Sequence, residues 1–107
     1  MKGRVLIIDG DRNYSHALRD QLKALGYEVL AEPNNASGIK VAETFSPSVI
    51  ITDTIPTDRE AFAALREIRV NHPHTPIIVA GEASSIETAL RAIQDEGAYH
   101  YFNKPVE

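Results

Sequence analysis

The sequence predicts an α/β fold in which helices cover both faces of a parallel β-sheet. Short apolar segments rich in β-branched residues alternate with longer segments whose apolar residues recur at helical spacing. The connections between them are short, and such strict alternation is typical of parallel sheets covered by helices. The length of 107 residues and the hydrophobic content of 43% fit one domain with one core, spanning 1–107.

Five segments have the character of strands. The first, "RVLII" at 4–8, becomes a continuous apolar run after its arginine, as expected of a strand that is buried on both faces. The second, "YEVLA" at 27–31, alternates between apolar and polar residues like a less buried strand. The remaining three strands are expected at 49–52, 77–80 and 99–102.

Four helices are expected between these strands. Gly26 and Gly97 stop the first and the last of them, because glycine is common just after a helix. Asn34, Asn35 and Ser37 offer an N-cap for the second helix. The apolar positions of the four helices are, in order, Tyr14, Leu18, Leu22 and Leu25; Ile39, Ala42 and Phe45; Phe62, Leu65 and Ile68; and Ile86, Ala89, Leu90 and Ile93.

The composition argues against several functional classes. A net charge of −4 without any basic block disfavours direct binding of this domain to nucleic acid, which requires clustered Lys and Arg. The absence of cysteine excludes disulfides, thiolate zinc sites and cysteine nucleophiles. No apolar run is long enough to span a bilayer, and acidic residues come too early for a secretory signal. We therefore expect a cytoplasmic protein without a membrane partner.

Charged residues lie just beyond the ends of three of the predicted strands. Asp9 and Asp11 follow the first strand, Asp53 follows the third and Lys104 follows the fifth. Ligand sites in parallel sheets lie beyond the carboxyl ends of the strands, so these charges should converge at one edge. A divalent cation such as Mg²⁺ would offset the repulsion between the carboxylates. One carboxylate could then attack a phosphoryl group while the lysine stabilises its oxygens.

Each of these residues also has a simpler structural interpretation. Asp11 could be the N-cap of the first helix, and Asp9 could be a turn residue at the end of a strand. Asp53 could cap a turn, and Lys104 could be a solvated surface lysine. The functional interpretation rests on their convergence and not on any one of them.

Three motifs make the chain resemble the receiver domain of two-component response regulators. "VLIIDGD" is similar to the family's first strand and acidic cluster, and "VIITD" to the third strand that ends in the phosphoacceptor. "AYHYFNKP" is similar to the fifth strand with its aromatic switch residue and lysine, and it leans towards receivers of the sigma-54 activator type. The resemblance covers essentially the whole chain. It implies a flavodoxin-like, doubly wound, five-stranded parallel sheet of order 2-1-3-4-5 with helices on both faces.

The resemblance implies a role for most of the residues at these strand ends. Asp53 would be the phosphoacceptor, and Lys104 and Thr54 would bind the phosphate. The donor would be a histidine kinase or a phosphotransfer protein, and the phosphorylated domain would act on an output domain or a partner protein. The implied ligands of Mg²⁺ are Asp9, Asp11, Asp53 and the backbone carbonyl of Ile55.

The chain also departs from the family pattern. Gly10 stands where a second acid is usual, which should weaken the metal site. Gly81 stands at the switch position that usually holds Thr or Ser, so its coupling to the second switch residue, Tyr101, should be weak. The sequence stops at Glu107, and we expect the fifth helix to be missing or truncated. The apolar surface left uncovered would invite a partner or a second copy, as in a homodimer.

Three functions remain open. A phosphorylatable receiver, which is a signalling domain and not an enzyme, is favoured because Asp53 and Lys104 are both present. A pseudo-receiver that binds partners without being phosphorylated is the alternative, motivated by the two glycines. A remote alternative is an aspartyl-nucleophile phosphatase. The stretch "IIDGD" resembles the Asp-x-Asp motif of that class, in which Asp9 would be the nucleophile and Asp11 the acid. That class leaves Asp53 unexplained.

Overall fold

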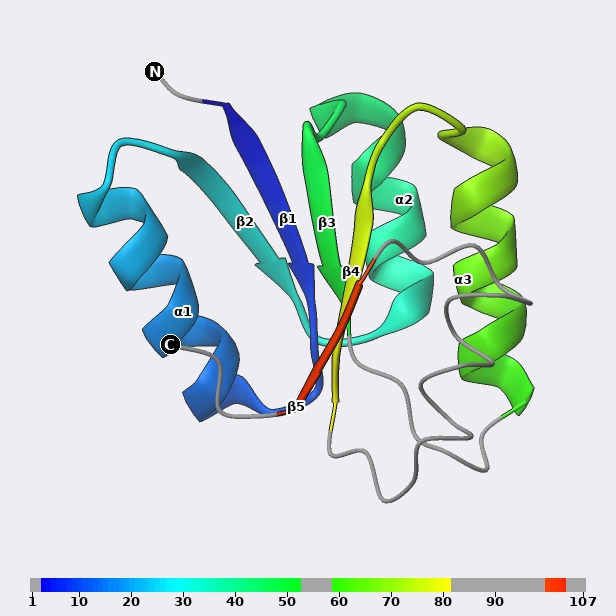
Figure 1. Cartoon of the computed structure of the whole chain (residues 1–107), viewed down its shortest axis with the longest axis horizontal. Coiled ribbons are helices and arrows are strands. Elements are labelled where there is room, and N and C mark those ends of the chain that lie inside the picture. Colours follow the sequence, from blue (N-terminus) through cyan, green and yellow to red (C-terminus); the bar gives the residue numbers. More distant parts are fainter. Residues whose placement is uncertain (1–2, 53–58, 82–99, 104–107) are drawn as a thin grey trace.

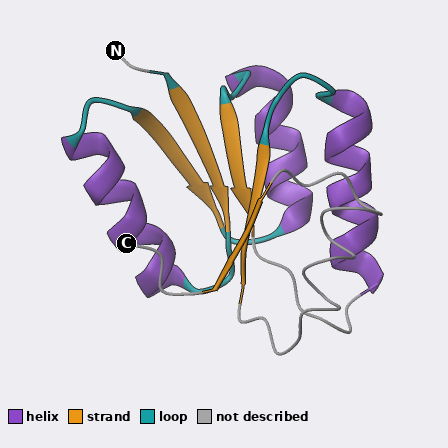
Figure 2. Ribbon diagram, in the orientation of Figure 1, coloured by secondary structure: helices purple, strands orange, loops and turns teal. Residues whose placement is uncertain are grey.

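A computed structural model of the chain describes residues 3–52, 59–81 and 100–103. Within these ranges a β-sheet lies between α1 on one face and α2 and α3 on the other (Figures 1 and 2). The expectation of helices on both faces is therefore confirmed. The strands are β1 Arg4–Ile8, β2 Glu28–Glu32, β3 Val49–Thr52, β4 Ile77–Gly81 and β5 His100–Asn103. The helices are α1 Arg12–Ala24, α2 Asn35–Phe45 and α3 Arg59–Asn71.

All neighbouring strands are parallel, in the order β2-β1-β3-β4-β5. This is the predicted order, and it reverses between β1 and β3. Ile8, the last residue of β1, pairs with Glu32 at the end of β2 and with Thr52 at the end of β3. The three strands therefore finish level with one another, at the edge where ligand sites of such sheets lie.

The apolar core lies on both faces of the central strands. On the face of α2 and α3, a buried cluster contains Leu6, Ile8, Ala42, Ile50, Ile68 and Ile77. On the face of α1, the buried residues are Val5, Ile7 and Val29. Residues 5–8 are therefore all buried, as predicted for β1. Each fully buried aliphatic side chain stabilises the fold by about 1.5–3 kcal/mol, so β1 anchors the whole sheet.

Helix α1 begins and ends at residues that satisfy its free backbone groups. The carboxylate of Asp11 accepts a hydrogen bond from the backbone N–H of Tyr14 (3.1 Å), so Asp11 is its N-cap. At the other end Gly26 has a φ of +102°, its N–H donates to the Lys23 carbonyl (3.0 Å), and that of Tyr27 donates to the Leu22 carbonyl (3.2 Å). These bonds form a Schellman motif, and they confirm the stop predicted at Gly26.

The same motif explains two errors in the sequence interpretation. Leu25 was expected on the apolar face of the first helix, but it is the C-cap of α1 and is 58% exposed. The second strand was expected from residue 27, but the N–H of Tyr27 closes the helix, and β2 begins at Glu28. The strands predicted at 77–80 and 99–102 end one residue later, because Gly81 pairs with Asn103. The fourth predicted helix and the question of a fifth lie outside the described residues.

Helix α2 is packed closely on β1 at Gly38. Its N-cap is Asn34, whose side chain accepts the N–H of Ser37 (2.9 Å). A Cβ atom at Gly38 would lie 2.4 Å from Cδ1 and 2.6 Å from Cγ1 of Ile8, which is shorter than real contacts. Glycine at this position thus lets α2 approach the strand that ends in the acidic cluster. None of the helices in the described ranges combines the length and the apolar character that crossing a bilayer requires.

Gly38→Ala should destabilise the wild-type protein but not a variant with a smaller residue 8. Overpacking of a core contact costs roughly 1–3 kcal/mol, more than the roughly 1 kcal/mol that alanine gains over glycine in a helix. In the Ile8→Ala background the clash is gone, and Gly38→Ala should raise the free energy of unfolding. Urea denaturation of the four proteins in this cycle measures the coupling.

Gly10→Ala is the matched control for the Gly38 cycle. A Cβ atom at Gly10 would meet its nearest neighbour, the carbonyl oxygen of Pro33, at 3.6 Å, which is an ordinary contact. Gly10→Ala should change the free energy of unfolding by no more than about 0.5 kcal/mol. Equal effects of Gly38→Ala in the two Ile8 backgrounds would contradict the proposed contact.

Candidate functional site

Asp9 is held at the carboxyl end of β1 by backbone and side-chain bonds. Its N–H donates to the carbonyl of Glu32 (3.0 Å), which continues the pairing of β1 with β2 by one residue. Its Oδ1 accepts a hydrogen bond from the N–H of Asp11 (2.8 Å). Only 4% of Asp9 is exposed. A carboxylate with both its backbone and its side chain fixed is therefore presented at the predicted edge of the sheet.

Asp11 lies in a different environment from Asp9. It is exposed, and its carboxylate caps α1 through the N–H of Tyr14. The structural interpretation of Asp11 as an N-cap is thus confirmed. Its role as a metal ligand stays a prediction. The capping bond from Tyr14 already engages one of its two carboxylate oxygens.

Gly10, between these two acids, is not required by the packing of the chain. Among the described glycines only Gly3 and Gly26 have a positive φ, so the backbone at Gly10 is open to other residues. The space around its missing Cβ would also accept a side chain. The absence of an acid at position 10 is therefore a chemical feature of this site and not a consequence of steric exclusion.

The sheet register brings three further strand ends to the edge occupied by Asp9. Thr52 ends β3 and is 3% exposed, while Gly81 and Asn103 pair at the ends of β4 and β5. The backbone of Tyr101 lies in β5 opposite Val79. Thr52 is the residue before Asp53 in the sequence, and Asn103 is the residue before Lys104, so both predicted site residues directly follow strand ends at this edge. Four predicted site residues lie outside the described residues: Asp53, Thr54, Ile55 and Lys104.

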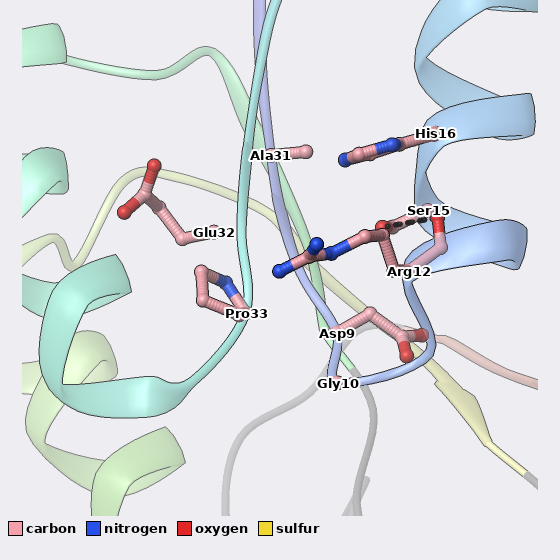
Figure 3. A pocket seen from close by; sticks show the side chains of 8 residues that line it. All are labelled: Asp9, Gly10, Arg12, Ser15, His16, Ala31, Glu32 and Pro33. Atoms are coloured by element: carbon pink, nitrogen blue, oxygen red, sulfur yellow. Dashed lines mark hydrogen bonds between the residues drawn. The ribbon is translucent and has the colours of Figure 1, made fainter.

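A pocket of about 290 Å³ opens beside Asp9, between the first turns of α1 and the end of β2 (Figure 3). Asp9 and Gly10 form one end of it, and Ala31, Glu32 and Pro33 form the side contributed by β2 and the residue after it. The helix contributes Arg12, Ser15 and His16. The sequence interpretation missed these helix residues, although the four-residue spacing of Arg12 and His16 directly after the acidic cluster was a usable signal.

The described residues fit part of a divalent-cation site. Asp9 supplies carboxylate oxygens, the ligand type that Mg²⁺ and Ca²⁺ prefer, and Gly10 supplies none. In the described ranges no three acidic or histidine side chains come together in a way that could hold a metal ion. A complete site would therefore need ligands beyond this part of the chain, such as the predicted Asp53 and Ile55.

Comparison with known proteins identifies the family of this chain. The family model of the response regulator receiver domain matches residues 5–107. The regulator NtrC of Bradyrhizobium is 31% identical over 105 residues, which cover 98% of this chain and 22% of that protein. FleR of Pseudomonas aeruginosa is 28% identical over 107 residues, covering 100% of this chain and 22% of that protein. NtrC-type relatives bear out the likeness to sigma-54 activators. The chain spans about a fifth of the length of these curated relatives.

Solved structures have the same fold. A response regulator from Burkholderia pseudomallei, determined with a phosphorylated aspartic acid, a calcium ion and citrate, has a TM-score of 0.87 and 25% identity; the match covers 97% of this chain and 61% of that one. The receiver domain of NtrX from Brucella abortus has a TM-score of 0.85 and 26% identity, over 96% of this chain and 87% of that one. With its parallel sheet of order β2-β1-β3-β4-β5 and the acid at the end of β1, the chain belongs to the response regulator receiver domain family.

Proposed function

We propose that this chain is a phosphoacceptor domain that takes phosphate from a histidine kinase or a phosphotransfer protein onto Asp53. The observation that carries the proposal is the buried, oriented carboxylate of Asp9 at the edge where β3 ends one residue before Asp53. In the transfer, a carboxylate oxygen of Asp53 attacks phosphorus, the bond to the donor nitrogen breaks, and an acyl phosphate forms. On this proposal the domain is a signalling module and not an enzyme.

Several residues of the chain would support that transfer. Lys104 and Thr54 would bind the phosphoryl oxygens, the lysine as a point charge. Asp9, Asp53 and the carbonyl of Ile55 would hold Mg²⁺, which when bound would neutralise the charge of the phosphoryl group. One solved relative contains both a phosphorylated aspartic acid and a calcium ion, which supports a role for a divalent cation in this proposal. Asp11 would contribute its charge from the cap position of α1.

The proposal extends to partners and location. The curated relatives are regulators about five times the length matched here, so we propose that this domain switches an output domain or a partner protein. A cytoplasmic location, a switch involving Gly81 and Tyr101, and association with a second copy belong to the same proposal. Direct binding of this domain to nucleic acid is not expected, given the net charge of −4.

A pseudo-receiver that binds partners without phosphorylation is the second candidate. The observation that favours it is Gly10, where the structure has room for an acid and the sequence has none. Loss of that ligand weakens the metal site directly, whereas it leaves the phosphoacceptor in place. The phosphatase alternative gains no support, because Asp11, its expected acid, is engaged as the N-cap of α1.

Phosphorylation is tested by the intact mass of the protein after incubation with acetyl phosphate and Mg²⁺. We expect the wild type to gain the mass of one phosphoryl group and Asp53→Asn to gain none, because the amide is a far weaker nucleophile than a carboxylate. Phosphate on Asp53→Asn would show that another residue is the acceptor and would contradict the assignment to Asp53. No adduct with any donor would favour the pseudo-receiver.

Gly10→Asp should tighten Mg²⁺ binding, because it restores an acidic ligand in a space that accepts a side chain. We expect the dissociation constant to fall roughly tenfold, equivalent to about 1.4 kcal/mol. Calorimetric titration of Mg²⁺ measures it.

Two control variants separate charge from shape in this titration. Gly10→Ala fills the same space without a charge and should leave the affinity unchanged. Asp11→Asn keeps a capping oxygen but removes the charge, so the affinity should fall if Asp11 contributes to the metal site; unchanged affinity would assign Asp11 to the cap alone. Gly10→Asp binding no more tightly than Gly10→Ala would remove the missing acid as the limit on metal affinity.

A further inference from the structure

The pocket between α1 and the end of β2 has a side-chain arrangement that the phosphoacceptor chemistry does not use. Two cationic or ionisable residues of α1, Arg12 and His16, lie one helical turn apart and line the same pocket. In Figure 3 the side chain of Arg12 extends across the pocket towards Pro33, and the ring of His16 points towards Ala31. Both side chains are thus aimed from the helix into the space in front of β2.

The guanidinium of Arg12 has no counter-ion in the part of the chain that the structure describes. The two ion pairs found in that part join Arg4 to Glu28 and Arg19 to Asp20. No hydrogen bond of the Arg12 side chain is found there either; its backbone carbonyl accepts the Ser15 hydroxyl (3.3 Å), drawn in Figure 3. Arg12 therefore keeps the donors of its planar fork, which suit a carboxylate or a phosphate.

The acids that line the pocket are turned away from this guanidinium. Figure 3 shows the carboxylate of Glu32 pointing away from Arg12, and that of Asp9 pointing towards the start of α1. Asp9 is also engaged by the N–H of Asp11. The side chains that point into the pocket are consequently donors, and the charge that they favour is negative.

We propose that this Arg12–His16 pocket binds a small free oxyanion, a phosphate or a carboxylate. Arg12 would donate to two oxygens of the anion. A ring N–H of His16 would donate to a further oxygen of phosphate, or would share one of the two oxygens of a carboxylate. The volume of about 290 Å³ is at the low end of ligand pockets, which usually enclose about 300–1,000 Å³, and it suits a compact anion. The site adjoins the phosphoacceptor edge through Asp9 and Gly10 but is independent of the proposed phosphorylation of Asp53.

The probes are inorganic phosphate and acetate, titrated separately into the ¹⁵N-labelled chain in metal-free buffer at constant ionic strength. We expect saturable shifts of the amide signals of residues 12–16 with millimolar affinity, and none with chloride. Arg12→Ala should weaken binding about tenfold, and Arg12→Lys should weaken it less because it keeps the charge but loses the fork. His16→Ala should weaken binding severalfold.

Two variants serve as controls for this titration. Arg19→Ala removes an arginine from the same helix outside the pocket and should bind the anions like the wild type. Lys104→Ala should also bind normally, which separates this site from the phosphate contacts proposed beside Asp53. Absence of saturable binding, an affinity that Arg12→Ala leaves unchanged, or binding that Lys104→Ala abolishes would each overturn the proposal.

The source of the anion is tested with a short blocked peptide that carries one glutamate. On the proposal, phosphate and acetate bind at least as tightly as this peptide, since the pocket has room for little beyond the charged group. Tighter binding of the peptide would overturn the assignment to a free anion and point to an acidic side chain of a partner protein.

Discussion

The burial of β1 between β2 and β3, with helices on both faces, is the constraint on which the rest of this structure depends. Residues 5–8 are buried, and their parallel pairing places Ile8 level with Glu32 and Thr52. Residues 5–8 are apolar on both faces, so the charged residues at the two ends of the run fix the register: a slip by one residue would draw Arg4 or Asp9 into the apolar core, where an unpaired charge is costly. The position of Asp9 at the edge follows from that register.

A short chain of local bonds connects this edge to the first helix. The carboxylate of Asp9 accepts the N–H of Asp11, and the carboxylate of Asp11 accepts the N–H of Tyr14. The acidic loop and the start of α1 are consequently one hydrogen-bonded unit. Arg12 is the first residue of the helix that this unit begins, and its side chain extends into the neighbouring pocket (Figure 3). The proposed phosphoacceptor edge and the proposed oxyanion pocket therefore share one structural support.

Three glycines near this unit are present for different physical reasons. Gly26 has a positive φ that closes α1, and Gly38 allows α2 to reach Ile8. Neither reason applies to Gly10, because its φ is not positive and the space around it would accept a side chain. Its significance lies in the acid that is missing. The metal binding proposed for this edge would therefore depend on a residue that the fold itself leaves open to change.

The sequence by itself determined the strand–helix alternation, the range of β1 and the stop at Gly26, because these depend on apolar periodicity and on local backbone needs. The receiver motifs also predicted the strand order and the edge where Asp9 lies. Tertiary structure alone decided that Leu25 is exposed, that Gly10 has room, and that Arg12 and His16 face the end of β2. These facts concern the space between residues that are distant in the chain, which packing sets and local sequence patterns do not encode.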